Sequence, residues 1–342
     1  MSPPLPSTSS PVIVGHGAFR YRVAADWPQL PGGWSFVEVV GVATDGDGNV
    51  LVLNRGEHPV IVFDRAGKFL RAWGEGLFNR AHGITMGPDQ NVWCVDDAGH
   101  TARKFTLDGQ LLFTLGTGHP SDTGAVGFDY RTIQRAAGPF NYPTNIAFGP
   151  AGHIYVSDGY SNARVHRFSA DCEWQFSWGT PGGKPGEFHV PHGIAIDSMG
   201  RVIVADRENS RLQRFTADGE FIDAWPAARP CQIALDGDDK IFVAELGYRA
   251  GMFPGNVAGP DQTTGGRFSI LNREGVLQTQ FGGGDEPCAP GDFFAPHDVC
   301  LDPWGDLYVS EVVYSAGGNR DLVPTTCHTL QKFIRLSDQE AS

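Results

Sequence analysis

Short apolar stretches alternate with turn residues along most of the chain. Around Ile194, an apolar run at residues 194–196 is followed by the turn DSMG and by a second apolar run at residues 202–205. Apolar runs of this length, bounded by Gly, Asp, Ser and Pro, are typical of β-strands joined by tight turns. The pattern therefore predicts a strand, a turn and a second strand in this segment.

The same strand–turn–strand window occurs six times, and internal repeats of this kind indicate a modular fold. The six windows are VGVATDGDGNVLVLNR from Val40, HGITMGPDQNVWCVDD from His82, TNIAFGPAGHIYVSDG from Thr144, HGIAIDSMGRVIVADR from His192, CQIALDGDDKIFVAEL from Cys231 and HDVCLDPWGDLYVSEV from His297. Further strand-like runs such as RLQRF and EFIDAW follow the windows, so each unit has about four strands. The sequence predicts an all-β fold, a six-bladed β-propeller.

The last unit lacks one strand, because only HTLQKFIRL clearly remains after its second strand. The run FRYRVAADW near the N-terminus can supply the missing strand and close the ring without an exposed sheet edge. We therefore expect a flexible tail at residues 1–17, a single propeller domain at residues 18–337 and a short tail at residues 338–342.

The first residue of each window defines what we call the axial column: Val40, His82, Thr144, His192, Cys231 and His297. Histidine occupies alternate units, and alternate blades of six lie about 120° apart, so three imidazoles can converge on the propeller axis. Three neutral imidazoles with an open fourth position form a familiar catalytic zinc shell. A single strand histidine is more often a packed structural residue, but three in one register favour a metal site. The other eight histidines share no column, and we expect them in loops or on the surface.

A second column, which we call the acidic column, closes the second strand of each window: Asn54, Asp96, Asp158, Asp206, Glu245 and Glu311. Arg55 and Arg207 follow it directly, and Tyr160 lies two residues past it. Two guanidiniums beside a metal suit an anionic substrate, and together they would stabilise a tyrosinate that acts as a base. The alternatives are that Arg207 pairs with Asp158, Asp206 or Glu208, and that Tyr160 packs on the rim.

Composition narrows the function classes. Hydrophobic residues make up 41% and charged residues 19%, and the net charge of −13 argues against nucleic acid or an anionic membrane as partner. No apolar run is long enough to span a membrane. We expect a small anionic organic substrate; the oligomeric state is not indicated.

The N-terminus has no basic start followed by an apolar region, so no signal peptide is predicted. The six cysteines form no CxxC pair, and Cys94, Cys231 and Cys300 fall in apolar strand patterns typical of buried free thiols. A reduced, cytoplasmic protein is the simplest interpretation, although a secreted chain without its signal peptide would have the same pattern.

The six repeat units resemble NHL repeats, and residues 40–336 resemble the catalytic core of peptidyl-α-hydroxyglycine α-amidating lyase. The matching motifs are NRGEH with Arg55, HG at His82, VSDGYSN with Tyr160, VPHGIAI with His192, VADRENSRLQRF with Arg207 and PHD with His297. The resemblance implies catalytic zinc on His82, His192 and His297, with Tyr160 as general base and Arg55 and Arg207 managing substrate charge. It also implies a structural calcium, with ligands from Val42, Ile84 and Asp298.

The implied reaction cleaves the C–N bond of a carbinolamide to give an amide and glyoxylate. The chain departs from the family at two positions: Ala295 replaces a methionine, and Ser161 replaces a cysteine of animal relatives. No monooxygenase domain is visible. The long segments 117–140 and 247–267 are candidates for lids that set an individual specificity.

Three functions remain open at this point. The first is a zinc-dependent lyase acting on an α-hydroxyglycine-type or related small α-hydroxy compound. The second is a hydrolase or hydratase that uses the same metal to activate water, since fold does not settle function. The third is an NHL interaction scaffold without a metal, which the alternate-blade histidines argue against.

Overall fold

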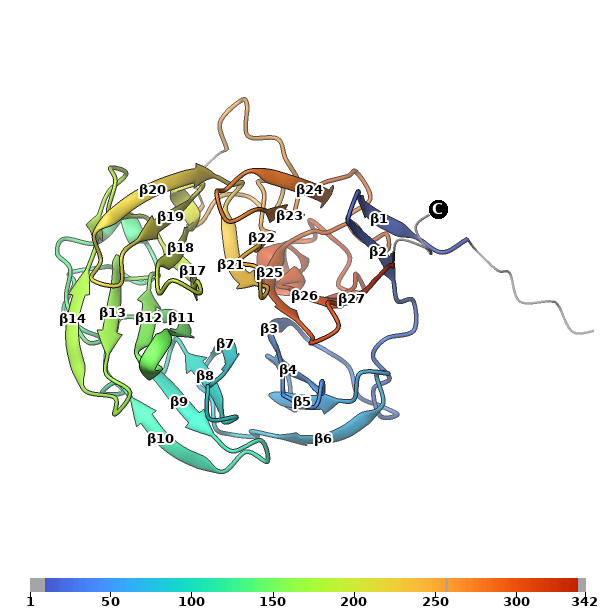
Figure 1. The fold of residues 1–342 in the computed structure, drawn as a ribbon, viewed down its shortest axis with the longest axis horizontal. Helices are drawn as coiled ribbons and strands as arrows, with labels where there is room; N and C mark the ends of the chain where they lie inside the picture. The colour runs from blue at the N-terminus through green and yellow to red at the C-terminus, as the bar shows by residue number, and fades with distance from the viewer. Residues whose placement is uncertain (1–9, 256–257, 338–342) are drawn as a thin grey trace, which may run out of the picture.

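Six antiparallel sheets surround a central axis in the computed structural model, which describes residues 10–255 and 258–337 (Figure 1). The first strand of each sheet lies nearest the axis and the last lies at the rim. The predicted all-β, six-bladed propeller is therefore confirmed.

Blades 1 to 3 follow the first three repeat windows. They consist of β3 (Val39–Thr44), β4 (Val50–Asn54), β5 (Val60–Phe63) and β6 (Phe69–Trp73); β7 (Ala81–Met86), β8 (Val92–Asp96), β9 (Thr101–Phe105) and β10 (Leu111–Leu115); and β11 (Pro143–Phe148), β12 (Ile154–Asp158), β13 (Arg164–Phe168) and β14 (Trp174–Trp178).

Blades 4 to 6 follow the remaining windows. They consist of β17 (Pro191–Ile196), β18 (Val202–Asp206), β19 (Arg211–Phe215) and β20 (Phe221–Pro226); β21 (Pro230–Leu235), β22 (Ile241–Glu245), β23 (Arg267–Leu271) and β24 (Leu277–Gly282); and β25 (Pro296–Leu301), β26 (Leu307–Glu311), β27 (Leu330–Arg335), β2 (Phe19–Val23) and β1 (Ile13–His16). Outside the blades lie a short parallel pair, β15 (Thr180–Pro181) and β16 (Glu187–Phe188), the helix α1 (Val313–Ala316) and the 3-10 turns η1 (Tyr130–Thr132), η2 (Pro150–Gly152), η3 (Arg207–Asn209) and η4 (Gly318–Arg320).

The N-terminal strand closes the ring, as predicted. β2 pairs antiparallel with β27, with Tyr21 opposite Arg335 and Val23 opposite Phe333, and the Tyr21 side chain is fully buried. β1 adds a fifth strand outside β2 and lies within the segment expected to be a tail, residues 1–17. Residues 1–9 of that segment, and the expected C-terminal tail at 338–342, lie outside the described residues.

The acidic column has a structural task. Each member ends the second strand of its blade, is buried, and accepts backbone N–H groups from the loop leading into the first strand of the same blade. The Asp96 carboxylate accepts from the N–H groups of Asn79 and Arg80, each at 2.8 Å, and Glu311 accepts from Phe294 at 2.8 Å and Ala295 at 3.0 Å. Because hydrogen bonds to a buried carboxylate are strong, this column fixes where each inner strand begins.

Valine, isoleucine and phenylalanine side chains fill the space between neighbouring blades; Val165, Ile194 and Phe215, for example, pack between blades 3 and 4. His166 does not lie in a loop or on the surface, as was expected. It lies in β13 and is fully buried, and the Asp158 carboxylate, 3.2 Å from its ring, supplies a polar partner. Within residues 10–255 and 258–337, no helix has the length and apolar character needed to cross a membrane.

Candidate functional site

Each residue of the axial column is the second residue of its inner strand. In all six blades the ladder between first and second strands shifts register at this residue. A β-bulge of this kind re-aims a side chain and leaves the residue outside regular pairing. The repeat therefore builds the same local backbone irregularity six times around the axis.

The three histidines of the column lie together, as the repeat predicted. His82, His192 and His297 are each at most 4% exposed, and one ligand nitrogen from each lies within 4.8 Å of the others. Their ring centroids are 4.8–5.0 Å apart. The three imidazoles form a candidate metal site among the described residues.

A carbonyl oxygen from the following blade holds each imidazole. The Nδ1 atoms donate to Thr144 O (2.7 Å, from His82), Cys231 O (2.8 Å, from His192) and Val40 O (2.8 Å, from His297). These three acceptors are the remaining members of the axial column. A carbonyl only accepts, so the proton must sit on Nδ1, and Nε2 carries the lone pair that can accept a hydrogen bond or bind a metal.

Glycine after two of the histidines permits this arrangement. A Cβ at Gly83 would lie 2.9 Å from Thr144 O, and one at Gly193 would lie 2.5 Å from Cys231 O. The HG dipeptides therefore reflect a close approach between the backbones of neighbouring blades, which a side chain would prevent.

Burial keeps the imidazoles neutral. Desolvation, reinforced by neighbouring histidines and arginines, lowers the pKa of His82 and His192 well below the usual value, and burial with the Arg55 charge lowers the pKa of His297 to about 3. Three neutral nitrogen donors grouped in this way fit a transition metal of the kind that imidazole binds.

The Tyr160 hydroxyl lies over this triangle. It is 3.0 Å from His82 Nε2 and 3.2 Å from His192 Nε2, and Arg207 Nη1 donates to it at 3.4 Å. The phenol is buried, in the loop that follows β12. The structure thus brings Tyr160 and Arg207 together with the imidazoles.

Arg55 and Arg207 both line a cavity of about 370 Å³, which His297 and Tyr160 also line. Each also forms an ion pair: Arg55 Nη1 lies 2.9 Å from Glu38 Oε2, and Arg207 Nε lies 2.8 Å from Glu208 Oε1. Arg207 therefore does pair with Glu208, which was one of the alternatives. Its side chain nevertheless lines the cavity.

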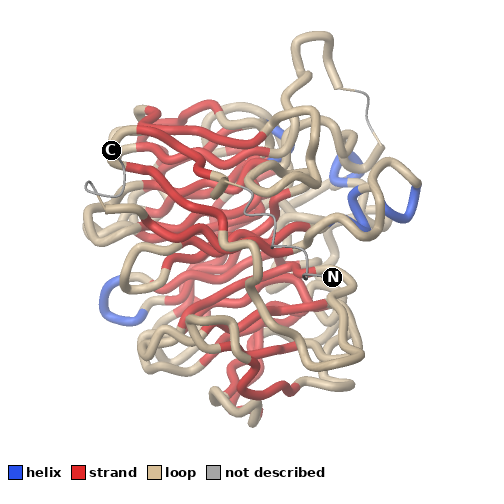
Figure 2. Tube along the Cα trace, turned by 90° about the vertical axis from the view of Figure 1, so that its right-hand side faces the viewer, coloured by secondary structure: helices blue, strands red, loops and turns tan. Residues whose placement is uncertain are grey.

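Loops and most of the short helical turns gather at one end of the propeller, the right-hand end in Figure 2. Both candidate lids contribute to the cavity wall, with Phe128 from residues 117–140 and Met252 and Phe253 from residues 247–267. A third segment was not predicted: Val312, Ala316 and Arg320, around α1 and η4, also line the cavity.

Arg80 and Arg229 also lie in the cavity wall, and neither was predicted from the sequence. Arg80 makes a two-pronged ion pair with Asp97 (2.7 and 2.5 Å), and its guanidinium lies 4.3 Å above the Phe128 ring. Arg80 and Arg229 occupy the position two residues before the axial column, so the register of the repeat is the sequence signal that they share. We call this position the mouth column: Glu38, Arg80, Tyr142, Val190, Arg229 and Ala295.

The cavity wall carries excess positive charge. Five arginines line it, namely Arg55, Arg80, Arg207, Arg229 and Arg320. Three carboxylates, those of Glu38, Asp97 and Glu208, pair with the first four. Five cations against three anions leave a net charge of +2, which favours an anionic ligand.

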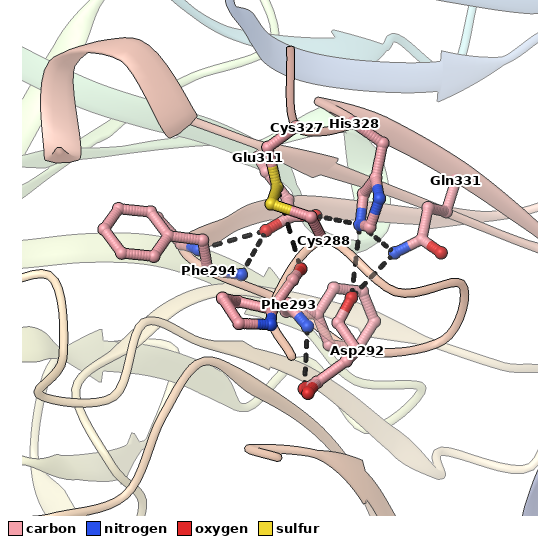
Figure 3. The surroundings of a disulfide bond; sticks show 10 residues. Cys288, Asp292, Phe293, Phe294, Glu311, Cys327, His328 and Gln331 are labelled. Atoms are coloured by element: carbon pink, nitrogen blue, oxygen red, sulfur yellow. Dashed lines mark hydrogen bonds and ion pairs between the residues drawn. A yellow bond between two sulfur atoms is a disulfide. The ribbon is translucent and has the colours of Figure 1, made fainter. Parts of the chain in front are cut away.

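A disulfide links the loop that precedes β25 to the loop that precedes β27 (Figure 3). Cys288 is bonded to Cys327, and next to it His328 pairs with Glu311 at 3.0 Å, while Glu311 holds the backbone at Phe294 and Ala295. The expectation of a fully reduced protein is wrong for these two cysteines, which lie 39 residues apart in loops and gave no motif. Cys94 and Cys231 are buried free thiols, as predicted, and Cys300 is a partly buried one.

The residues implied for calcium lie on a separate cavity of about 420 Å³, lined by Val42, Ile84 and Asp298. The Asp298 carboxylate accepts from the N–H groups of Val42 (3.1 Å) and Val299 (2.7 Å), and burial raises its pKa to about 8. Both oxygens are engaged by the backbone, so calcium stays a prediction from the resemblance.

Comparison with known proteins shows which family the chain belongs to. An NHL repeat model matches residues 140–168 and 188–215. Human NHL repeat-containing protein 3 is 33% identical over 243 residues, which cover 66% of this chain and 67% of that protein. Mouse peptidyl-glycine alpha-amidating monooxygenase is 31% identical over 246 residues (60% of this chain, 23% of that protein). A probable peptidyl-alpha-hydroxyglycine alpha-amidating lyase of Caenorhabditis elegans is 33% identical over 162 residues (46% of this chain, 43% of that protein).

Solved structures agree on the fold. A gluconolactonase from Xanthomonas campestris superposes with a TM-score of 0.61 at 12% identity, covering 97% of both chains. Virginiamycin B lyase from Staphylococcus aureus superposes with a TM-score of 0.55 at 15% identity, covering 93% of this chain and 88% of that one. The chain therefore belongs to the NHL-repeat family of six-bladed β-propellers and resembles the peptidyl-α-hydroxyglycine α-amidating lyases within it.

Proposed function

We propose that this chain is a metal-dependent lyase that cleaves the C–N bond of an α-hydroxyglycine-type carbinolamide, or a related small α-hydroxy compound, and releases an amide and glyoxylate. The observation that carries the proposal is the Tyr160 hydroxyl placed 3.0 and 3.2 Å from the Nε2 atoms of His82 and His192, beside an arginine-lined cavity. The names of the amidating-lyase relatives support the same reaction class.

Zinc is the metal we propose for His82, His192 and His297. Three neutral imidazoles with one open position are a typical catalytic zinc shell, and a zinc ion bound there would supply Lewis acidity to a substrate oxygen. Calcium on Val42, Ile84 and Asp298 is proposed from the family resemblance alone.

The arginines select the substrate. A carbinolamide of this class carries a carboxylate, which suits the guanidinium of Arg55 or Arg207. Apolar side chains such as Leu246, Phe253 and Val312 form the remaining wall, where the acyl part of the substrate can pack. The substrate is thus a small anion with an apolar tail.

Tyr160 acts as the general base. After giving up its own proton, with the Arg207 guanidinium donating to its oxygen, it removes the proton of the substrate hydroxyl. The oxygen lone pair then forms the aldehyde C=O bond while the C–N bond breaks, and the bonding electrons pass to the amide nitrogen. That nitrogen takes back the proton from Tyr160, so the phenolate is regenerated and no covalent intermediate with the protein is needed.

The compartment also belongs to the proposal. Cytoplasm was the sequence-based prediction, but structural disulfides such as Cys288–Cys327 are typical of oxidising compartments. An oxidising location is therefore the better expectation for the folded chain.

Glyoxylate release from α-hydroxyhippurate tests the function. Protein loaded with zinc is expected to produce glyoxylate and benzamide in equal amounts, and a chelator is expected to stop the reaction. A metal-loaded protein that produces no glyoxylate would contradict the lyase and favour the water-activating hydrolase or hydratase. A folded protein that binds no metal would contradict both enzymes.

A further inference from the structure

Two arginines share one buried carboxylate beside the candidate site. Arg207 Nε lies 2.8 Å from Glu208 Oε1, and Arg229 approaches the same carboxylate with Nη2 at 2.8 Å and Nε at 3.3 Å. The side chains of Arg207, Glu208 and Arg229 are 4%, 0% and 1% exposed. We call this group the ionic triad.

The ionic triad holds an unbalanced charge. One carboxylate offsets one of its two guanidiniums, and a buried charge without a counterion is strongly disfavoured. Neighbouring groups do not cancel this excess, because Arg55 and Arg80 line the same cavity and are balanced one for one by Glu38 and Asp97. The remaining positive charge is therefore available to an anionic ligand in the cavity.

Arg229 also makes contacts that Arg207 does not make. Its Nη1 donates to the carbonyl oxygens of Gly247 (3.0 Å) and Gly251 (2.7 Å), which belong to residues 247–255, here called the lid segment. The lid segment carries Phe253, whose ring centroid lies 5.5 Å from that of Tyr160 and 5.2 Å from the Arg207 guanidinium. Arg229 thus joins the lid segment and Arg207 through a single side chain.

We propose that Arg229 is a positioning residue for the lyase reaction. Through Glu208 it fixes the Arg207 guanidinium against the Tyr160 hydroxyl, and through the two carbonyls it couples closure of the lid segment to that alignment. Its charge also makes the cavity wall selective for substrates with a carboxylate. The inference rests on the proposed function for its catalytic part, whereas anion binding and lid closure can be measured independently.

Two substitutions separate the effect of the Arg229 charge from the effect of its hydrogen-bond geometry. Arg229→Met leaves Arg207 and Glu208 as a neutral pair and releases both lid carbonyls. Arg229→Lys keeps the charge, but a lysine lacks the planar guanidinium whose N–H groups bond the carboxylate and both carbonyls together. Arg214→Met is the matched control, because Arg214 is also buried (8% exposed, against 1% for Arg229) and pairs with Asp223 at 2.5 Å, but lies in β19 and does not line the cavity.

The test compares the zinc-loaded wild type with Arg229→Met, Arg229→Lys and Arg214→Met. Metal content is expected to be unchanged in all four. For α-hydroxyhippurate, Arg229→Met is expected to raise KM and to lower kcat/KM by about 100-fold, since small misplacements of catalytic groups have effects of that size. Arg229→Lys is expected to restore KM but not kcat, a split that general destabilisation does not produce. Arg214→Met should retain wild-type kinetics.

Two further measurements work without turnover. Hippurate, which keeps the carboxylate but lacks the hydroxyl, is expected to bind Arg229→Met more weakly than the wild type in calorimetry. Trypsin is expected to cleave after Arg249, in the lid segment, about tenfold faster in Arg229→Met, because two charge-assisted hydrogen bonds to that segment are lost.

The outcomes are distinguishable. A wild type without glyoxylate release overturns the proposed function, and hippurate binding with trypsin cleavage then decides the inference. The inference itself is overturned if Arg229→Met and Arg229→Lys match Arg214→Met in hippurate affinity and lid cleavage. It is also overturned if the lid opens in Arg229→Met while KM and kcat stay at wild-type values. If Arg229→Met does not fold, Arg229→Lys carries the comparison of kcat and of lid cleavage, and wild-type values of both in Arg229→Lys would overturn the inference.

Discussion

At the scale of single residues, the orientation of each imidazole depends on a backbone atom of the neighbouring blade. His192 Nδ1 reaches Cys231 O at 2.8 Å, and Gly193 is the residue that lets the two backbones approach. Partners of this kind, outside the ligands themselves, contribute strongly to metal affinity.

Gly193→Ala is therefore expected to weaken metal binding by about 10–100-fold. The new Cβ would lie 2.5 Å from Cys231 O and would move the carbonyl that orients His192. Zinc affinity measured by chelator competition checks this result. Gly237→Ala is the control, since nothing lies within 4 Å of its added Cβ. Equal affinities for the two variants would contradict the role of the carbonyl.

Tyr160→Phe is expected to lower kcat for α-hydroxyhippurate by about 10²–10⁴-fold with metal content unchanged, because a general base contributes that much. Steady-state glyoxylate release and metal analysis check both parts. Tyr155→Phe serves as control, since that hydroxyl donates to Ala217 O away from the cavity. Activity that survives in Tyr160→Phe would show that another group takes the proton.

At the scale of elements, the acidic column connects the end of one strand to the start of the inner strand. In blade 6 the link is reinforced by His328, whose ion pair with Glu311 lies beside the disulfide (Figure 3). Burial alone lowers the pKa of His328, but Glu311 and the Asp292 carbonyl outweigh it, so the net pKa is raised above the usual value.

A raised folded pKa predicts a pH dependence of known sign. The protonated His328 stabilises the folded state fully below the unfolded histidine pKa of about 6.5, and this contribution is lost as pH rises through the higher folded pKa. The contribution of His328 to the free energy of unfolding is therefore expected to decrease above about pH 6.5. Urea unfolding at several pH values checks it, with His328→Gln expected to remove that part of the slope. An identical slope in the variant would contradict the ion pair.

At the scale of the whole molecule, β2 closes the ring and buries Phe19, Tyr21 and Val23 against blades 5 and 6. Deleting residues 1–24 is expected to reduce the free energy of unfolding by about 5 kcal/mol, given the area lost with three large side chains. It would also expose the β27 edge to pairing between molecules.

Chemical denaturation and size-exclusion chromatography check this prediction. Deleting residues 1–17 removes β1 but keeps β2, and should leave a monodisperse, stable propeller if the domain begins near residue 18. A chain lacking residues 1–24 that is as stable as this control would contradict closure by β2.

Much of the fold could be predicted because each blade is coded locally, by an apolar run, a turn and a second run. The three histidines could be predicted because the repeat puts them in one register. The bulge at the axial column could not, since register shifts have no residue signature of their own. Arg229 reaches the cavity through contacts with Gly247 and Gly251, and Cys288 meets Cys327 across 39 residues. Such loop contacts depend on the assembled ring and not on local patterns.

The central claim is that His82, His192 and His297 hold one metal ion, and metal content per chain tests it most directly. The wild-type protein, supplied with zinc and then freed of excess metal, is expected to retain about one transition-metal ion per chain held by these three ligands. His192→Ala, folded as judged by circular dichroism, is expected to lose it. A folded wild type that retains no metal, or a His192→Ala variant that retains as much as the wild type, would contradict the account.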